Sequence, residues 1–267
     1  MSRVPVTVVI IARNEERNID DCLASVSGWA NEILVVDDGS TDRTVELARR
    51  RGARVLQRRM VTEGSHRNWA YSQSANQWVF SLDADERLTP ALCAEIDTVL
   101  GAGTTHTHFT VPRKNFLGSY WMRWGGQYPA AQVKLLMKDH FRWEDTGVHP
   151  RAEAGGTTCG HLKEFMLHYT YRDFTEALRK LNGQTTLEAR KWFNVRATDK
   201  RKADGKMNLG CMLWRALDRF FRAYVGRQGW RDGFIGFMMA YQGSLYQVIS
   251  YAKYWEMVNL NEQAPQG

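Results

Sequence analysis

Along the first hundred residues, short continuous apolar runs alternate with segments in which apolar side chains recur every three or four positions. A continuous apolar run is typical of a strand buried on both faces, and the longer spacing is typical of a helix with one buried face. The expected strands cover residues 6–11, 33–36, 53–57 and 78–82. This alternation predicts an α/β fold with a doubly wound, mostly parallel sheet, whose functional groups lie at the carboxyl ends of the strands.

Polar residues mark where three of the intervening helices begin. Asn14 can cap the first helix, and Ser40 or Thr41 can cap the second. Thr89 is followed by Pro90, and proline suits the first helical position because its missing N–H would have no partner there. We therefore expect these helices to begin directly after the loops at the strand ends.

The chain changes character twice after the fourth strand. Residues 104–170 are rich in β-branched and aromatic side chains, which predicts mixed strands and long loops. From Asp173 the pattern is helical, and a polar stretch at 194–206 is expected to be a mobile loop. The predicted organisation is one domain at 1–170 and a helical region at 171–267.

The helical region contains a basic amphipathic helix. Its apolar stripe consists of Leu209, Met212, Leu213, Ala216, Leu217, Phe220, Phe221 and Tyr224. Arg215, Arg219 and Arg222 lie off that stripe, an arrangement typical of a helix that lies in a membrane interface. The same pattern also suits a helix that packs on the protein's own core, and the sequence leaves both alternatives open.

A second segment of this region, residues 233–252, contains no charged side chain. A run of about 20 apolar residues is long enough to cross a bilayer. Gln242, Ser244, Gln247 and Ser250 interrupt this run. An interfacial or buried helix is therefore favoured over one that spans the membrane.

The 267 residues carry a formal charge of +7. This excess favours an anionic partner such as a phospholipid, a nucleotide or a phosphorylated glycan, although a generally basic surface gives the same number. No recognisable module for nucleic-acid binding is present. The four cysteines lie far apart, which argues against a zinc knuckle or a disulfide framework and predicts reduced thiols. The apolar run after Arg3 is too short for a signal peptide, so a cytoplasmic location is expected.

The strongest chemical signal is Asp83-Ala84-Asp85, directly after the fourth apolar run. Two carboxylates on a turn at the end of a strand can face one hard cation, and Mg²⁺ and Mn²⁺ prefer carboxylate and phosphate oxygens. Such a cation would neutralise the charge that develops on a diphosphate leaving group. The motif is short, and Asp85 with Glu86 can equally cap the following helix.

Two further loops carry polar groups at strand ends. After the second strand the chain reads Asp37-Asp38-Gly39-Ser40, and a carboxylate here can bind a base or a ribose, although a helix-capping turn explains the same run. The loop after the first strand reads Ala12-Arg13-Asn14-Glu15, and Arg67-Asn68 can reach a diphosphate from the start of a later helix. Neither Gly-x-Gly-x-x-Gly nor Gly-Lys-Ser/Thr follows the first strand, which argues against a dinucleotide dehydrogenase and a P-loop enzyme.

Taken in order, these motifs resemble family 2 glycosyltransferases of the GT-A fold. The resemblance rests on Val-Val-Ile-Ile-Ala-Arg-Asn-Glu-Glu at 8–16, Val-Val-Asp-Asp-Gly-Ser-Thr-Asp at 35–42 and Ser-Leu-Asp-Ala-Asp-Glu at 81–86. Five later stretches are similar to the branch that contains lipopolysaccharide inner-core β-1,4-glucosyltransferases, namely 111–118, 125–129, Glu144-Asp145, Val148-His149 and 167–169, and the likeness continues to 254–256. It implies a nucleotide-sugar-binding half at 1–103, an acceptor-binding half at 104–170 and a membrane-associated helical appendage at 171–267.

The resemblance also implies roles for the residues of each motif. Asp38 resembles the uracil-binding aspartate, and Asp83 and Asp85 resemble the metal motif, with Asp85 as the more direct ligand. Glu144-Asp145 resembles the acidic pair in which the aspartate is the catalytic base, although a surface turn would explain this pair equally well without the resemblance. The base removes a proton from an acceptor hydroxyl as that oxygen attacks the anomeric carbon opposite the diphosphate, and this single displacement inverts the configuration.

Four more residues are candidates for contacts with the metal or with phosphates. His149 and His168 can each bind either, and we favour His168 as the ligand, although a lone histidine is more often structural. Pro150 follows His149 where relatives often have an acidic residue, which argues against an acid role there. Arg113 and Lys114 can meet acceptor phosphates or remain solvated charges.

The expected activity is therefore that of a metal-dependent, inverting hexosyltransferase at the cytoplasmic face of the inner membrane. It would move a hexose, preferably glucose, from a UDP-sugar onto a lipid-linked saccharide such as the lipopolysaccharide core, with Mg²⁺ or Mn²⁺ bound. One alternative is a polyprenyl-phosphate glycosyltransferase, which shares the donor site. Another is a non-catalytic binding protein on a degenerate GT-A fold.

Overall fold

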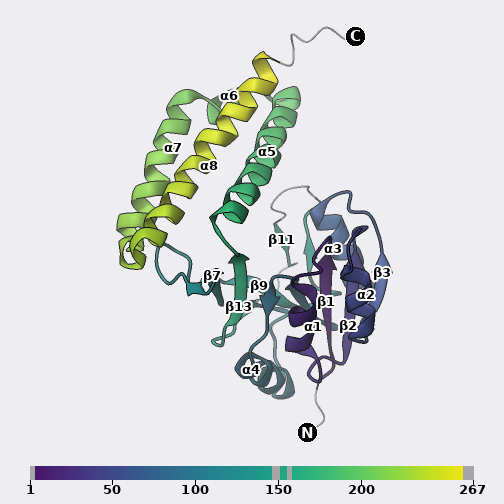
Figure 1. Cartoon of the computed structure of the whole chain (residues 1–267). Helices are drawn as coiled ribbons and strands as arrows, with labels where there is room; N and C mark the ends of the chain where they lie inside the picture. Colours follow the sequence, from purple (N-terminus) through teal and green to yellow (C-terminus); the bar gives the residue numbers. More distant parts are fainter. Residues whose placement is uncertain (1–3, 146–150, 155–157, 261–267) are drawn as a thin grey trace. The chain divides into compact units, whose positions relative to one another are not determined.

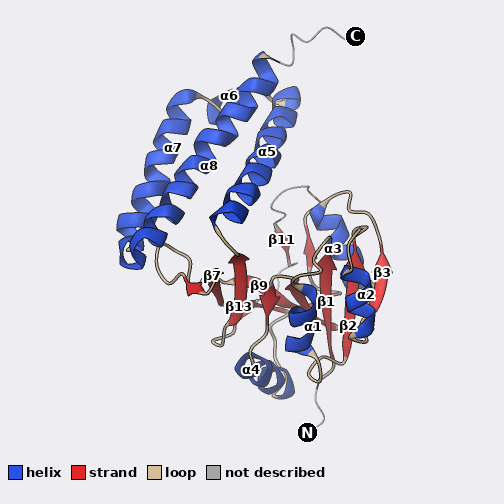
Figure 2. Cartoon of the chain, viewed as in Figure 1, coloured by secondary structure: helices blue, strands red, loops and turns tan. Residues whose placement is uncertain are grey.

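The computed structural model describes residues 4–145, 151–154 and 158–260 of the chain (Figure 1). The chain forms two compact units, and each is described here by itself. The first unit comprises Met1–Asn115 and Pro129–Thr170, and the second comprises Phe116–Tyr128 and Tyr171–Gly267. The first contains most of the strands, whereas the second is mainly helical (Figure 2).

The first unit is built on a seven-stranded sheet with the order β12-β6-β9-β4-β1-β2-β3. Its strands are β1 (Val6–Ala12), β2 (Glu32–Asp37), β3 (Arg54–Gln57), β4 (Trp78–Asp83), β6 (His108–Val111), β9 (Gln132–Met137) and β12 (Cys159–His161). The four strands β3, β2, β1 and β4 are mutually parallel, and β9 runs antiparallel between β4 and β6. The expected doubly wound, mostly parallel sheet is confirmed. Because the chain moves outward from β1 to β3 and then returns to β4 on the other side of β1, a ligand crevice is expected at this switch point.

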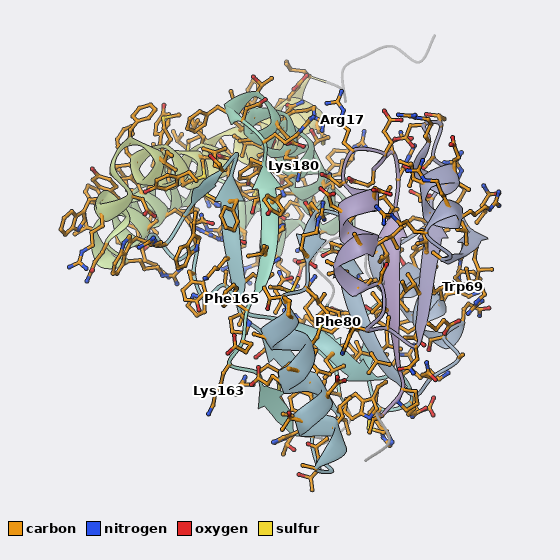
Figure 3. All side chains as sticks on the ribbon, turned by 60° about the horizontal axis from the view of Figure 1, so that its bottom comes forward. Arg17, Trp69, Phe80, Lys163, Phe165 and Lys180 are labelled. Atoms are coloured by element: carbon orange, nitrogen blue, oxygen red, sulfur yellow. The ribbon has the colours of Figure 1, made fainter. Side chains whose placement is uncertain are left out.

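Apolar side chains cover both faces of this sheet. The helices of the unit are α1 (Ile19–Val26), α2 (Thr44–Arg50), α3 (Glu63–Ser72) and α4 (Pro90–Gly101). Side chains of α1, α2 and α4 share one core with the alternate residues of β1 and with Phe80, whereas α3 packs Ala70 and Tyr71 into a second core on the other face. Figure 3 labels Phe80 in the first core and Trp69 of α3, which is partly buried under the guanidinium of Arg58 at 4.5 Å. The sheet is therefore a rigid support for the loops at its edge.

Two of the predicted helix caps are wrong. The first helix begins only at Ile19, and Asn14 instead has a left-handed backbone with φ of 55°. The second helix begins at Thr44, whose N–H is bound by the Asp42 carboxylate at 3.0 Å and not by Ser40 or Thr41. The third prediction is confirmed, since the Thr89 side chain accepts the N–H of Leu92 ahead of α4.

Smaller sheets complete the first unit and lead into the second. Strand β5 (Glu86–Arg87) pairs antiparallel with β13 (Met166–Tyr171), which is followed in the sheet order by β7 (Arg113–Leu117) and β8 (Tyr120–Trp121). The chain passes from one unit to the other within β7 and within β13. A separate two-stranded ribbon pairs β10 (Arg142–Trp143) with β11 (Ala152–Glu153).

The second unit is a layer of long helices. It contains α5 (Phe174–Thr198), α6 (Lys200–Lys206), α7 (Leu209–Phe221), two short helices η1 (Arg222–Gly226) and η2 (Gly229–Asp232), and α8 (Gly233–Asn259). The expected loop at 194–206 is wrong, because α5 continues to Thr198 and α6 follows at once. The Asp199 side chain caps α6 by accepting the N–H of Lys202, and Ala203 and Met207 are buried on one side of this segment. Among the described residues, no helix has the length and apolar character needed to cross a bilayer.

Candidate active site at the carboxyl edge of the sheet

The register of the parallel strands brings three of the predicted loops to one edge. Ala12, the last residue of β1, pairs with Asp37 of β2, and Ile11 pairs with Asp83 of β4. The loops that follow these strands therefore begin within one residue of each other along the sheet. This arrangement follows directly from the parallel direction of the three strands.

The loops after β1 and β2 are tied together by Asn14. Its backbone N–H donates to Ser40 Oγ at 2.9 Å, and its side-chain oxygen accepts the N–H of Thr41 at 2.8 Å. The next residue, Glu15, donates its N–H to Thr44 Oγ1 at 2.8 Å. Asn14 therefore links the two loops through hydrogen bonds of its backbone and its side chain, a role that needs its left-handed backbone.

Asp38 is held in a fixed orientation at this edge. It is buried, and its Oδ1 accepts the N–H of Met60 at 2.8 Å while its Oδ2 lies 3.5 Å from the guanidinium of Arg13. The side chain of Arg59 crosses Gly39, where any Cβ would collide with it, and donates to the Asp38 carbonyl at 2.7 Å. The φ of 74° favours glycine at this position, whereas movement of the flexible Arg59 side chain could relieve the overlap with a Cβ.

Two cations already pair with Asp83. Lys134 Nζ of β9 lies 2.8 Å from Oδ2, and the guanidinium of Arg67 lies 3.4 Å from Oδ1. Burial would raise the pKa of the Asp83 carboxyl, but Lys134 and Arg67 outweigh this effect and hold the pKa below its ordinary value. Asp83 is therefore an anion whose two oxygens are both engaged by the protein.

Lys134 also belongs to a buried network of ion pairs, which the sequence motifs did not predict. Its Nζ also lies 2.6 Å from Oε2 of the fully buried Glu86, whose other oxygen lies 3.4 Å from Arg113. The Arg113 side chain is largely buried in this ion pair. It is therefore not a solvated charge, and little of it is accessible to an acceptor phosphate. One signal was present in the sequence, since a lysine in the otherwise apolar run at 133–137 needs a buried partner.

Asp85 and His168 lie close together beside this network. The antiparallel pairing of β5 with β13 sets Glu86 opposite His168, and Asp85 Oδ2 lies 3.7 Å from His168 Nε2. The other ring nitrogen, Nδ1, is 2.7 Å from the side-chain oxygen of Asn115, which orients the imidazole. Ala84, between the two aspartates, packs into the core.

Asp83, Asp85 and His168 are compatible with a divalent cation that takes its remaining ligands from the oxygens of a bound substrate. Among the residues described, no three His, Cys, Asp or Glu side chains are close enough to form a metal cage by themselves. Mg²⁺ commonly binds through one or two protein groups together with substrate phosphates. Asp85 and His168 have the chemistry for this arrangement, whereas Asp83 would first have to exchange a contact with Lys134 or Arg67.

The N-terminus of α3 fixes the acidic pair Glu144-Asp145. Thr62, the N-cap of α3, makes a short hydrogen bond from Oγ1 to Asp145 Oδ1. Gly64 allows the Glu144 carbonyl to approach the helix so closely that any Cβ at this position would collide with it. His149 lies outside the described residues.

The segment around α3 therefore connects the separate motifs. Met60 binds Asp38, Thr62 binds Asp145, and Arg67 binds Asp83, all within eight positions of the chain. Further along the helix, the Asn68 side chain makes two hydrogen bonds of 2.8 Å to the backbone of Trp143. The contacts made by Thr62 and Gly64 were not predicted, because neither residue belongs to a motif.

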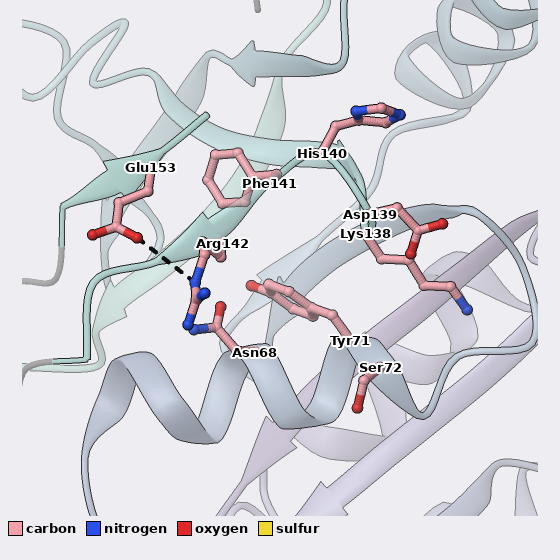
Figure 4. A pocket seen from close by; sticks show the side chains of 9 residues that line it. All are labelled: Asn68, Tyr71, Ser72, Lys138, Asp139, His140, Phe141, Arg142 and Glu153. Atoms are coloured by element: carbon pink, nitrogen blue, oxygen red, sulfur yellow. Dashed lines mark ion pairs between the residues drawn. The ribbon is translucent and has the colours of Figure 1, made fainter. Parts of the chain in front are cut away.

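A pocket of about 900 Å³ is lined by Asn68 and by residues nearer the C-terminus of α3. Figure 4 shows its lining, in which Tyr71 of α3 points toward the segment 138–142 and a dashed line marks the ion pair of 3.6 Å between Arg142 and Glu153. Of the predicted site residues, Asn68 alone lines this pocket, and both ends of its side-chain amide are engaged by the backbone of Trp143. We assign no part of the donor site to it.

Comparison with known proteins agrees with this architecture. Residues 7–153 match the family model described as "Glycosyl transferase family 2". The lipopolysaccharide core biosynthesis glycosyltransferase LpsC of Rhizobium meliloti is 26% identical over 95% of this chain and 93% of its own length. The uncharacterized glycosyltransferase RP128 of Rickettsia prowazekii is 35% identical over 49% of this chain and 38% of its own.

A solved structure of glucosyl-3-phosphoglycerate synthase from Mycobacterium tuberculosis, in complex with Mn²⁺, uridine diphosphate and glucosyl-3-phosphoglycerate, is also similar. It shares 25% identity, with a TM-score of 0.35 over 44% of this chain and 45% of that one. The family model spans more than half of the chain and includes every strand of the parallel edge. The chain therefore belongs to glycosyl transferase family 2 and has the GT-A fold, with a helical C-terminal region.

Proposed function

We propose that this protein is an inverting glycosyltransferase that moves a hexose, with glucose as the first candidate, from a UDP-sugar onto a lipid-linked saccharide. The observation that carries this proposal is the convergence on one short segment, 60–67, of contacts to Asp38, Asp83 and Asp145. A donor site and a catalytic carboxylate must lie side by side for a single displacement at the anomeric carbon.

Each group in the proposed site has a distinct task. Asp38 would accept a hydrogen bond from the uracil ring, beside the backbone of Ala12, Arg13, Asn14 and Glu15. Arg67 would share its positive charge with the diphosphate. Asp145 would act as the base for the acceptor hydroxyl, with Thr62 fixing the carboxylate and the adjoining Glu144 held against α3.

We propose that Mg²⁺ or Mn²⁺ is held by Asp85 and His168, with Asp83 close by. When bound, the cation would neutralise negative charge on the leaving diphosphate. The protein's own part is to fix these groups: Asn115 orients the imidazole, and Lys134 orients Asp83. Ala84 keeps the two aspartates on one turn through its buried side chain.

The acceptor proposal rests on likeness along the whole chain. LpsC, described as a lipopolysaccharide core biosynthesis glycosyltransferase, matches almost the full length of this sequence, including the helical region. A core saccharide attached to lipid is presented at a membrane surface. We accordingly propose that region 171–267 holds the enzyme peripherally at the cytoplasmic face of the inner membrane.

A thermal-shift panel tests the donor and metal assignments together. UDP-, GDP- and dTDP-sugars are each added with and without Mn²⁺, since a ligand that binds the folded state raises the melting temperature. The expected result is a response to UDP-sugars that requires Mn²⁺ and is lost in Asp85→Ala but kept in Asp139→Ala, an exposed aspartate outside the site. An equal response to all three nucleotides, or none, would contradict the proposal.

A further inference from the structure

Two exposed arginines of the second unit lie over tryptophan rings. The guanidinium carbon of Arg123 is 4.4 Å from the ring centroid of Trp121. That of Arg231 is 4.6 Å from the centroid of Trp124 and 5.3 Å from the centroid of Trp230. Cation–π contacts of this kind limit the positions that a long, flexible side chain can take. Both guanidinium groups are therefore held in place at the surface.

A third arginine, Arg227, contacts the loop that carries Trp124. Its backbone carbonyl accepts the N–H of Gly125 at 2.9 Å. Its side chain passes so close to Gly126 that a Cβ at this glycine would lie only 2.5 Å from Nη1. The loop at 123–126 thus contacts Arg227 directly and Arg231 through Trp124.

The acidic residue nearest in sequence to these arginines does not neutralise them. Asp232 is the only Asp or Glu within 116–128 and 222–236, and it is buried. Its carboxylate accepts the Tyr120 hydroxyl at 3.1 Å and the backbone N–H groups of Arg123 and Trp124 at 2.9 and 2.8 Å. Asp232 is therefore bound by neutral donors, and its task is to fix the loop that carries Trp124.

The guanidinium groups of Arg123, Arg227 and Arg231 thus have donors to offer a ligand. Within the described part of the chain, none of the three forms an ion pair or donates a hydrogen bond. Arg222 of the same segment differs, because its guanidinium pairs with Asp218 at 2.7 Å. The cations without an acidic partner are therefore those that lie at the tryptophans and their loop.

The backbone around Arg227 and Arg231 is irregular. The preceding turn, η1, is a π-helix, a rare conformation that is frequent at functional sites. Gln228 has a left-handed backbone with φ of 56°, and any Cβ at the buried Gly229 would collide with the backbone of η1. Unfavourable conformations persist only where the surrounding packing maintains them. The two arginines therefore project from a backbone with little freedom.

We propose that this surface binds an acidic saccharide, a sugar that carries phosphate or carboxylate groups. The arginine–tryptophan site consists of Arg123, Arg227, Arg231, Trp124 and Trp230. This inference rests on the proposed function and names the chemical class of its acceptor. Guanidinium N–H groups donate in pairs to phosphate and carboxylate oxygens. Trp230 keeps 53% of its surface accessible, and the C–H bonds of a sugar ring pack against an indole face.

A lipid headgroup offers the same phosphate chemistry but suits the site less well. Cations that are held on a rigid backbone match a ligand whose anionic groups also have fixed separations, because neither partner then loses much freedom on binding. The substituents of a sugar ring meet this condition. Phospholipid headgroups move independently within a membrane, so a lipid surface is the weaker candidate.

Titrations of the full chain, followed by saturation-transfer NMR without donor or metal, test this proposal. The probes are galactose, galacturonate and galactose 6-phosphate, which differ only in the group at C6. We expect both acidic sugars to bind at least about tenfold more tightly than galactose, through charge-assisted hydrogen bonds. Arg231→Gln should weaken their binding about tenfold, and Trp230→Leu about threefold through the lost cation–π contact. Both variants should keep the melting temperature of the unaltered chain, because both side chains are exposed.

Arg222→Gln is the matched control, because it removes an arginine of the same segment that already pairs with Asp218. Its affinity for the acidic sugars should equal that of the unaltered chain. Binding of only one acidic sugar would support the proposal and identify the anionic group.

Four results would overturn it. These are equal affinity for galactose and the acidic sugars, equal loss in Arg222→Gln and Arg231→Gln, inorganic phosphate binding as tightly as galactose 6-phosphate, and binding to phosphatidylglycerol vesicles without binding to either acidic sugar. Because no probe contains a nucleotide, failure here is distinguishable from failure of the UDP-sugar response.

Discussion

Lys134 Nζ lies 2.8 Å from Asp83 Oδ2, so the first aspartate of the Asp-x-Asp motif is neutralised by a cation of the protein itself. The same ammonium lies 2.6 Å from Glu86, and both Lys134 and Glu86 are almost completely buried. Burial would lower the pKa of Lys134, but Asp83 and Glu86 raise it above the ordinary value, so the group stays charged. Asp83 thus has a structural task, which is consistent with the proposal that Asp85 is the more direct metal ligand.

Lys134→Met should destabilise the protein strongly. Removing the ammonium leaves the fully buried Glu86 carboxylate next to Asp83 and without the cation that lies 2.6 Å from it, and breaking a buried ion pair in this way costs about 3–5 kcal/mol. The free energy of unfolding in urea measures the effect. Lys138→Met is the control, because Lys138 Nζ donates to the backbone carbonyl of Ser74 at 2.7 Å, and loss of this hydrogen bond should cost about 1 kcal/mol. Equal losses in the two variants would contradict the assigned network.

Thr62→Val should separate a catalytic effect from an effect on stability. Thr62 caps α3 and also binds Asp145, whereas Thr89 caps α4 in the same way without a contact to the acidic pair. Thr62→Val and Thr89→Val should each cost about 1 kcal/mol of stability as lost caps. Only Thr62→Val should also lower kcat, by about tenfold, because a hydrogen bond to a charged group is lost. Parallel unfolding and kinetic measurements decide this, and unchanged kcat in Thr62→Val would refute the positioning role.

Gly64→Ala should displace the segment that carries Asp145. A methyl group at this position collides with the Glu144 carbonyl, and relief of such overlap costs about 1–3 kcal/mol. Gly101→Ala is the matched control, since Gly101 is also helical and has open space around its Cα. It should stabilise the protein by about 0.5–1 kcal/mol. Thermal unfolding compares the stability of the two variants. If Gly64→Ala were as stable as the unaltered protein, the contact between Gly64 and the Glu144 carbonyl would not be tight.

Asp145→Asn should remove the base and leave the donor site intact. General-base catalysis contributes about 100- to 10,000-fold to the rate, so kcat should fall within this range. The shift of melting temperature by UDP-sugar and Mn²⁺ should persist, because Asp38, Asp85 and Arg67 are unchanged. Asp139→Asn is the control and should keep full activity. If Asp145→Asn kept the kcat of the unaltered protein, Asp145 would not be the catalytic base.

Stability should decline in mild acid because of His66. This side chain is 1% exposed, and neither ring nitrogen has a hydrogen-bond partner within the described part of the chain. Burial and the nearby Arg58 hold the pKa of His66 below its ordinary value of 6.5. The unfolded chain therefore binds a proton below pH 6.5 while the folded chain does not, and the free energy of unfolding falls as the pH drops through that value.

Urea unfolding of the native chain and of His66→Gln, from pH 8 downward, measures this contribution. The variant should show a shallower decline below pH 6.5 and no change of slope above it, where the imidazole is neutral in both states. If the two profiles had the same slope in mild acid, another group would be responsible for it.

The apolar pattern along the chain was sufficient to predict the parallel sheet and the order of the motifs at its strand ends. Apolar runs such as 6–11 and 78–82 report burial locally, and parallel strands place their carboxyl ends at one edge. Asp38 and Asp83 could therefore be assigned to one edge from the sequence, and the pairing of β1 with β2 and β4 confirms that placement. Local information sufficed because strand direction alone decides which loops are neighbours.

Which side chains meet at that edge could not be predicted, because it depends on how distant segments pack. Thr62 and Asp145 are 83 positions apart, and Lys134 and Asp83 are 51 apart, so no local pattern reports either pair. The cap predicted at Asn14 was wrong for the same reason. The backbone N–H of Asn14 binds Ser40, 26 residues away, and its side-chain oxygen binds Thr41, 27 residues away. A side chain's periodicity predicts its burial, but its partner depends on how distant segments pack, and that packing is fixed only by the whole fold.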